Sequence, residues 1–248
     1  MSETALVVMA RYPMRGTTKT RLARTLGDAE TLQLYRAFLI DLAGHFAGTN
    51  YDLHWTYTPA EVDYSAFMAE LIPDLAHFTR SFAQQGSDLG ARLLHTFQWT
   101  YQQGYTSTIV IGSDTPHITR ELVAQAQAAL QEADVVLGPA DDGGYYLIAM
   151  REPHDVFTEI PMSTSVVAEQ TITRAIKLGL TVRLIAPLFD IDEHADLLRL
   201  AELLRVNNTL APATAAQIAS LRSAIHDHDS TDHASATAGS YSAALNLS

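Results

Sequence analysis

The sequence predicts a single α/β domain in which a mostly parallel sheet carries helices on both faces. Short apolar runs rich in β-branched residues recur along the chain, and segments with the 3.6-residue period of helices lie between them. Strands that alternate with helices imply right-handed crossovers and parallel pairing. A hydrophobic content of 47% in 248 residues is enough to build the core of one such domain.

The elements follow one another in a regular order. The expected strands are residues 5–10, 52–58, 107–112, 134–139, 145–150 and 181–186. The expected helices are residues 29–46, 88–101, 119–133, 166–178 and 193–204. Thr119 can cap the third helix, and Gly179 follows the fourth. We therefore place the domain at residues 1–205, a helical extension at 206–225 and a disordered tail at 226–248, where all periodicity is lost.

Charge and composition exclude several classes of function. A formal net charge of -12 opposes binding to nucleic acid or to an anionic membrane and favours small partners. No apolar run reaches the roughly 18 to 20 residues of a membrane span, and the N-terminus carries an acid where a signal peptide has basic residues, so we expect a cytoplasmic protein. The chain has no cysteine, so a metal ion would have to bind oxygen or imidazole ligands.

The loop after the first strand, "ARYPMRGTTKTRLAR" (residues 10–24), concentrates positive charge. Five of the sixteen basic residues lie here without an acid among them: Arg11, Arg15, Lys19, Arg21 and Arg24. Gly16 and three threonines add backbone and hydroxyl donors, which predicts a phosphate-binding loop; a solvated basic face is the alternative. The spacing matches neither the Walker A motif nor the three-glycine dinucleotide motif.

Acidic residues follow two later strand-like segments. Asp114 ends "IVIGSD" (109–114), and a carboxylate at the carboxyl end of a parallel strand projects into the ligand crevice; capping of the next turn is the alternative. Asp190 and Asp192 stand two residues apart, so on an extended chain both can face one cation such as Mg²⁺ or Mn²⁺. Capping of the following helix is the alternative for Asp192 and Glu193.

The stretch "VLGPADDGGYYLIAM" (136–150) places two acids and two glycines between apolar runs. Asp and Gly accept turn conformations at low cost, which predicts a hairpin turn. Tyr145 and Tyr146 point to opposite sides of an extended chain, so one of them is expected to face a crevice.

Five stretches, taken in order, resemble the GT-A-type nucleotide-diphospho-sugar transferase superfamily. More narrowly they are similar to a bacterial glycosyltransferase-like group related to the guanylyltransferases for 2-phospholactate and phosphoenolpyruvate. The stretches are "MARYPMRGTTKTRLA", "QQGSDLGARL", "VIGSDTPHIT", "VVLGPADDGGYYLIAM" and "DIDEHADL", which together reach to about residue 200. The resemblance implies a single GT-A-like, Rossmann-like domain. Met162 departs from the group, which tends to have Trp there.

The resemblance also implies roles for individual residues. Those expected to hold the nucleotide phosphates are Arg11, Gly16, Lys19, Thr20 and Arg21, and those near the base or ribose are Gln85, Gly86 and Asp88. Asp114, assisted by Asp190 and Asp192, would bind Mg²⁺ or Mn²⁺, and Asp114 and Lys19 would be the catalytic pair. The wall of an acceptor pocket would consist of Asp142, Gly143, Gly144 and Tyr145.

Three functions fit this set of residues. The first is transfer from a nucleoside-diphosphate sugar to a small acceptor, with a divalent cation on the diphosphate. The second is nucleotidyl transfer to a small phosphorylated acceptor with release of pyrophosphate, which the same cationic loop and metal could serve. The third is a nucleotide-binding protein without catalysis.

Overall fold

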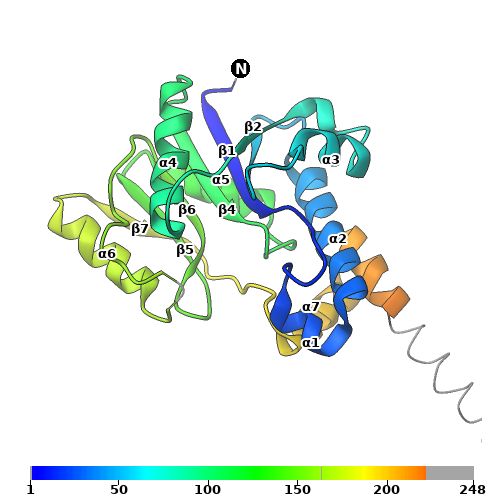
Figure 1. Cartoon of the computed structure of the whole chain (residues 1–248). Coiled ribbons are helices and arrows are strands. Elements are labelled where there is room, and N and C mark those ends of the chain that lie inside the picture. The colour runs from blue at the N-terminus through cyan, green and yellow to red at the C-terminus, as the bar shows by residue number, and fades with distance from the viewer. Residues whose placement is uncertain (1, 163, 222–248) are drawn as a thin grey trace, which may run out of the picture.

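A seven-stranded sheet forms the centre of the molecule (Figure 1). The computed structural model describes residues 2–162 and 164–221. The strands are β1 (Thr4–Arg11), β2 (Asp52–Thr58), β3 (Thr79–Ala83), β4 (Ser107–Gly112), β5 (Val135–Pro139), β6 (Tyr145–Met150) and β7 (Val182–Leu184). Their spatial order is β3-β2-β1-β4-β6-β5-β7. β6 runs antiparallel to β4 and β5, and the other neighbouring pairs are parallel. The predicted α/β class and mostly parallel sheet are confirmed.

Helices cover both faces of this sheet. They are α1 (Thr20–Leu26), α2 (Asp28–Phe46), α3 (Tyr64–Leu71), α4 (Leu89–Gln102), α5 (Arg120–Ala129), α6 (Val167–Lys177) and α7 (His194–Val206), with short 3₁₀ turns at Ala76–Phe78 and Asn208–Leu210. One apolar core joins the sheet to α2, α3, α5 and α7, and a second core joins the other face to α4 and α6. Within the described part of the chain, no helix is long and apolar enough to span a bilayer.

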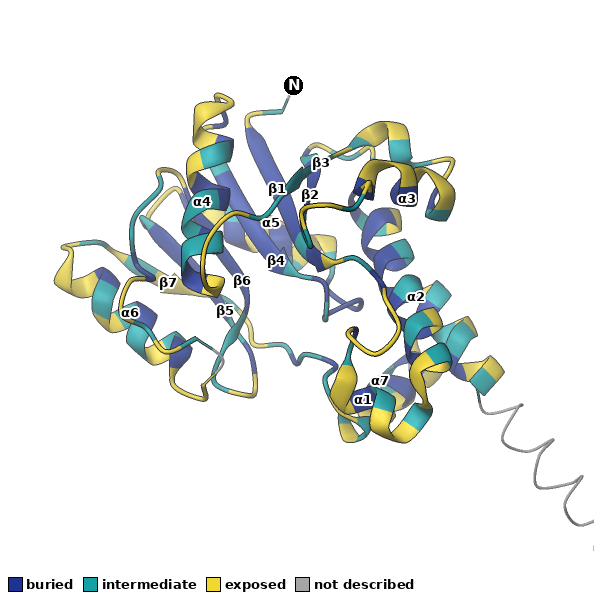
Figure 2. Ribbon diagram, viewed as in Figure 1, coloured by how far each residue is buried: buried dark blue, intermediate teal, exposed yellow. Residues whose placement is uncertain are grey.

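β1 shows why the sheet is buried on both sides. Leu6 and Val8 belong to the first core, whereas Ala5 and Val7 belong to the second, as the period of two along a strand requires. All four side chains are fully buried, and Figure 2 shows the central strands as a buried layer between the helices. Parallel strands between two helix layers have this apolar, non-alternating sequence.

Two elements, β3 and α3, were missing from the sequence prediction. β3 ("TRSFA") is an edge strand with partly exposed side chains, so it lacks the apolar run that marks the central strands. α3 has only eight residues, too few to show a clear helical period. Asp63 caps it by accepting a hydrogen bond from the Ala66 N–H. α1 begins at Thr20 within the basic stretch and ends beyond it at Leu26. After α7 the described chain is helical again at 212–221; the tail expected at 226–248 lies outside the described residues.

The order of the strands creates a crevice at one edge of the sheet. From β1 the chain continues to β2 on one side, whereas β4 lies on the other side of β1. The loops that leave β1 and β4 therefore diverge, and ligands of open α/β sheets bind at the carboxyl ends of strands where this divergence occurs. Because β6 is antiparallel, the turn that joins β5 to β6 lies at the same edge.

Candidate functional site

Lys19 lies at the centre of the crevice. Its ammonium is 2.8 Å from a carboxylate oxygen of Asp114 and 2.8 Å from one of Asp192, and it donates a hydrogen bond of 2.6 Å to the carbonyl oxygen of Ile191. The Lys19 side chain is 5% exposed, whereas those of Asp114 and Asp192 are 38% and 43% exposed. The loop after β1, the loop after β4 and the segment before α7 thus converge on one cation.

Local backbone structure places this lysine. In the loop before it, the hydroxyl of the buried Thr18 accepts a hydrogen bond from the Met14 N–H. Lys19 itself has φ 49° and ψ 49°, a left-handed conformation that costs a non-glycine residue about 1–2 kcal/mol. α1 begins at the next residue, Thr20. The conformation of Lys19 is therefore held by tertiary contacts and not by local preference.

The acidic partners are held in a similar way. The N–H of Ile191 donates to the carbonyl oxygen of Asp114 over 2.9 Å, which ties the segment before α7 to the loop after β4. α7 then starts with a capping box between Glu193 and Asp196. The cap is thus supplied by Glu193, and the carboxylate of Asp192 is left to pair with Lys19.

Burial and neighbouring charges shift the pKa values of Lys19, Asp190 and Asp192. Burial alone would lower the pKa of Lys19, but Asp114 and Asp192 outweigh it and raise this pKa above the usual 10.5. Burial would raise the pKa of Asp192, and the Lys19 ammonium lowers it instead. Burial and the charge of Asp114 raise the pKa of Asp190 to about 7. The pKa shifts of Lys19 and Asp192 therefore both favour their ion pair.

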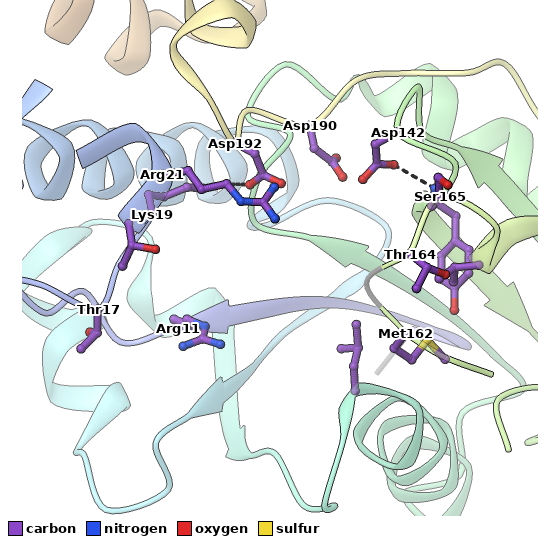
Figure 3. Close-up of a pocket in the computed structure, with 15 residues that line it drawn as sticks. Arg11, Thr17, Lys19, Arg21, Asp142, Met162, Thr164, Ser165, Asp190 and Asp192 are labelled. Atoms are coloured by element: carbon purple, nitrogen blue, oxygen red, sulfur yellow. Dashed lines mark hydrogen bonds and ion pairs between the residues drawn. The ribbon is translucent and has the colours of Figure 1, made fainter. Parts of the chain in front are cut away.

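A pocket of about 850 Å³ opens beside Lys19 (Figure 3). Its cationic wall consists of Arg11, Lys19 and Arg21, with Thr17 and Thr20 beside them. Figure 3 shows Asp142 and Asp190 next to each other on the other side, and these two residues form its acidic wall. The remaining lining consists of Leu89, Gly144, Tyr145, Met162, Thr164, Ser165, Val167 and Asp192. One pocket thus combines cations, acids, hydroxyls and an apolar surface.

A smaller hollow of about 160 Å³ adjoins the pocket and shares Arg11, Lys19 and Leu89 with it. It lies over the carboxyl ends of β1 and β4, and its lining includes Gln84, Arg92 and Asp114. The side-chain amide of Gln84 donates to the carbonyl oxygens of Ala10 and Thr56, so this side chain is fixed between two strand ends.

The turn between β5 and β6 combines both expectations for this stretch. It is a hairpin turn, and Asp142, Gly144 and Tyr145 line the pocket. Gly143 has φ +88°, and a Cβ there would overlap the backbone carbonyl of Ser165. The glycine therefore permits close approach of the 164–165 backbone, not of a ligand. Tyr146 is buried on the other side of β6.

Some expected residues do not reach the pocket lining. Gly16 has a positive φ in an open turn, and Gln85 and Gly86 lie exposed on the loop after β3. Asp88 caps α4 by accepting a hydrogen bond from the Ala91 N–H, which with its neighbour Ser87 lowers the pKa of Asp88. Their neighbours line the two hollows instead: Thr17, Gln84, Leu89 and Arg92.

Other lining residues had no sequence signal. Thr164 and Ser165 lie in an irregular segment without periodicity, and they reach the pocket because Gly143 lets this segment pack against the turn. Tyr35 lines the smaller hollow from the middle of α2, where its helical spacing predicts only a core residue. Met162, in contrast, was singled out in the sequence as a departure from the related group, and it lines the pocket.

The expected metal ligands do not surround one point. Asp114 and Asp192 meet at Lys19, whereas Asp190 faces Asp142 (Figure 3). Among the described residues, no group of three or more His, Asp or Glu side chains is arranged to hold a metal ion. The atoms around the Lys19 ammonium are nevertheless oxygens, the donors that Mg²⁺ and Mn²⁺ prefer. The donor set fits a divalent cation in kind, and the ammonium occupies the place between the donors.

Comparison with known structures identifies the family. A crystal structure of a protein from Desulfovibrio desulfuricans G20, provisionally assigned as a nucleotide-diphospho-sugar transferase, matches 92% of this chain and 98% of its own, with a TM-score of 0.83 and 34% identity. The chain belongs to the nucleotide-diphospho-sugar transferase-like family.

Two further comparisons match parts of the chain. The model of a family described as an uncharacterized protein conserved in bacteria (DUF2064) matches residues 48–164. The structure of 4-diphosphocytidyl-2C-methyl-D-erythritol synthase from Anaerococcus prevotii DSM 20548 covers 82% of this chain and 100% of its own, with a TM-score of 0.53 and 8% identity. At that identity the likeness concerns the fold alone. No curated protein matches the sequence.

Proposed function

We propose that this protein is a divalent-metal-dependent transferase that uses a nucleoside-diphosphate sugar and a small acceptor. The observation that carries the proposal is the convergence of Lys19, Asp114 and Asp192 beside a pocket with one cationic and one acidic wall. Membership of the nucleotide-diphospho-sugar transferase-like family supports it. The position of the pocket at the diverging loops of the sheet is where an α/β protein binds such a ligand.

We assign each part of the substrates to a region of the lining. The diphosphate would bind the cationic wall, because Arg11 and Arg21 offer several fixed donors and Lys19 a point charge. The nucleoside would extend toward the smaller hollow beside Gln84 and Arg92. The sugar and the acceptor would lie against the acidic wall and the apolar surface.

The proposed reaction exchanges one bond to carbon for another. The acceptor's hydroxyl oxygen bonds to the anomeric carbon of the sugar, and the bond from that carbon to the diphosphate oxygen breaks. The nucleoside diphosphate leaves with the bonding electron pair, and the hydroxyl proton passes to a carboxylate of the acidic wall. Asp114 and Asp192, with Asp190 nearby, would hold Mg²⁺ or Mn²⁺, which neutralises charge on the leaving diphosphate. Positioning by the two walls supplies the rest of the catalysis.

A substrate panel tests this proposal. We expect the protein with Mn²⁺ to release a nucleoside diphosphate from at least one member of a panel of UDP-, GDP-, CDP-, ADP- and dTDP-sugars, with water or a small alcohol as acceptor. Pyrophosphate release from a nucleoside triphosphate would instead favour nucleotidyl transfer, and nucleotide binding without turnover would favour a non-catalytic binder.

A pair of charge variants links the activity to the pocket. Arg11→Met removes a cation from the cationic wall and should lower kcat/KM by about tenfold or more, since a lost charge-assisted hydrogen bond costs about 1.5–3 kcal/mol. Arg24→Met removes the same charge from an exposed position on α1 that is not among the described lining residues. Equal losses in the two variants would place the activity elsewhere.

A further inference from the structure

Two ion pairs of Lys19 in the crevice conflict with metal binding. The Lys19 ammonium lies between the carboxylates of Asp114 and Asp192, at 2.8 Å from each, and also contacts the Ile191 carbonyl. A divalent cation that bound both carboxylates would have to occupy the same place. The two kinds of cation therefore exclude each other at this pair of acids.

The charges give the direction of this competition. With Lys19 in place the three groups carry a net charge of -1, and without it the two carboxylates carry -2. Lys19 thus lowers the attraction for a dication and adds a direct repulsion. The carboxylates are about two-fifths exposed, so solvent ions can reach them.

The Lys19 ammonium could also bind an anion in the large pocket. It lines the large pocket together with Arg11 and Arg21, on the wall proposed to bind the diphosphate. Its four-carbon side chain is flexible, and its left-handed backbone conformation is held only by tertiary contacts. An anion in the pocket would give the ammonium a new partner and release the two carboxylates.

We infer that Lys19 makes metal binding conditional on the phosphate ligand. In the free protein its ammonium occupies the place between Asp114 and Asp192 and keeps divalent cations out. When a diphosphate enters the pocket, Lys19 moves to the phosphate and the carboxylates become available to the metal that accompanies it. By linkage, the metal strengthens phosphate binding by the same factor. The inference rests on the proposed function for the identity of the anion, but its test does not use turnover.

Binding of Mn²⁺ alone, followed by the electron paramagnetic resonance signal of free Mn²⁺, tests the inference on the full chain without nucleotide. Wild type should bind Mn²⁺ weakly. Lys19→Met should bind it about tenfold more tightly or better, within the 5- to 150-fold range common for coupled sites. The added binding should disappear in the double variant Lys19→Met, Asp192→Asn, because one of the two carboxylates is then lost.

Two controls complete the experiment. Arg24→Met removes one positive charge from exposed α1 and should leave Mn²⁺ binding as in wild type. Lys19→Gln keeps a donor toward the carboxylates without the charge, and it replaces the methionine variant if that variant does not fold. The inference is overturned if wild type already binds Mn²⁺ tightly, if the folded Lys19 variants gain nothing, or if Arg24→Met gains as much.

The Mn²⁺-binding experiment and the nucleotide-sugar panel can succeed or fail independently of each other. A Lys19 variant that gains Mn²⁺ binding supports the inference even if no nucleotide sugar is turned over. Turnover of a nucleotide sugar by a wild-type protein that binds Mn²⁺ tightly without nucleotide would uphold the proposed function and overturn the inference.

Discussion

The hydroxyl of Tyr35 connects the two loops that carry the site. It accepts a hydrogen bond from the Arg11 N–H over 3.0 Å and lies 2.9 Å from the Ser113 hydroxyl. Burial and the charge of Asp114 raise the pKa of Tyr35 to about 12, so the phenol stays protonated and can donate to Ser113. One side chain of α2 thus fixes the end of β1 relative to the loop after β4.

Replacement of Tyr35 by Phe removes both contacts. The part-buried Arg11 N–H and the buried Ser113 hydroxyl each lose a partner. An unsatisfied buried group costs about 1–3 kcal/mol, and the free energy of unfolding measured with urea should fall by that amount. Tyr101→Phe is the matched control, because this tyrosine is 50% exposed on α4. A similar small effect in both variants would show that Tyr35 does not join the loops.

At the residue scale the sequence predicts the cations and acids of the site but not all of their contacts. Lys19 and Asp114 are predictable because each follows a strand that ends at the same edge of the sheet. The hydrogen bond from Lys19 to the Ile191 carbonyl is not predictable, since every residue carries the same backbone group. The direct pairing of Lys19 with the expected metal ligands is also not predictable, because spacing along the chain does not show which charged side chains meet in the fold.

At the scale of elements, the turn between β5 and β6 forms one side of the pocket. Its length and glycines predict a hairpin, and the hairpin reverses β6 within an otherwise parallel sheet. The segment with Thr164 and Ser165 packs against Gly143, and the Gly143 carbonyl accepts a hydrogen bond from the Ala168 N–H at the start of α6. This packing depends on chain segments that are distant in sequence and have no periodic pattern, so it could not be predicted.

Gly143→Ala should therefore disturb more than the local backbone. The left-handed φ of +88° costs alanine about 1–2 kcal/mol, and the overlap with Ser165 adds about 1–3 kcal/mol. Gly179→Ala is the control, because Gly179 has φ +77° and open space around a Cβ. Thermal unfolding should show a clearly larger loss for Gly143→Ala, and equal losses would exclude the overlap as a cause.

At the scale of the whole molecule, alternation of apolar strands and amphipathic helices was sufficient to predict the class of fold. The central strands are predictable because burial on both faces leaves an apolar run, as in β1. Edge strand β3 and the short helix α3 are not predictable, since they bury too few apolar side chains to produce such a run. The same deep burial places His54 and His117 inside the molecule, at 1% and 3% exposure.

These two histidines make stability depend on pH. Burial lowers the pKa of each to about 4, with Arg80 adding to the effect at His54 and Arg199 at His117. The unfolded chain takes up protons below pH 6.5, but the folded one does so only near pH 4, so this stability is present above pH 6.5 and is lost as pH falls toward 4. Each histidine lowers the free energy of unfolding by about 1.4 kcal/mol per pH unit in that window.

The variant His117→Leu measures this contribution. Within the described part of the chain both ring nitrogens of His117 lack a hydrogen-bond partner, so leucine loses little bonding. Urea unfolding between pH 7 and 4.5 should show a shallower loss of stability in His117→Leu than in wild type. His77→Leu, at an exposed position, should keep the wild-type slope. A slope unchanged by His117→Leu would contradict burial as the cause.

We propose that the crevice between the loops after β1 and β4 binds a nucleoside diphosphate. A crystal structure of the full chain with Mn²⁺ and the nucleoside diphosphate that binds best in the panel tests it most directly. We expect phosphate oxygens within hydrogen-bonding distance of Arg11 and Lys19, beside Asp114. Phosphates bound elsewhere, with Lys19 still paired to Asp114 and Asp192, would contradict it.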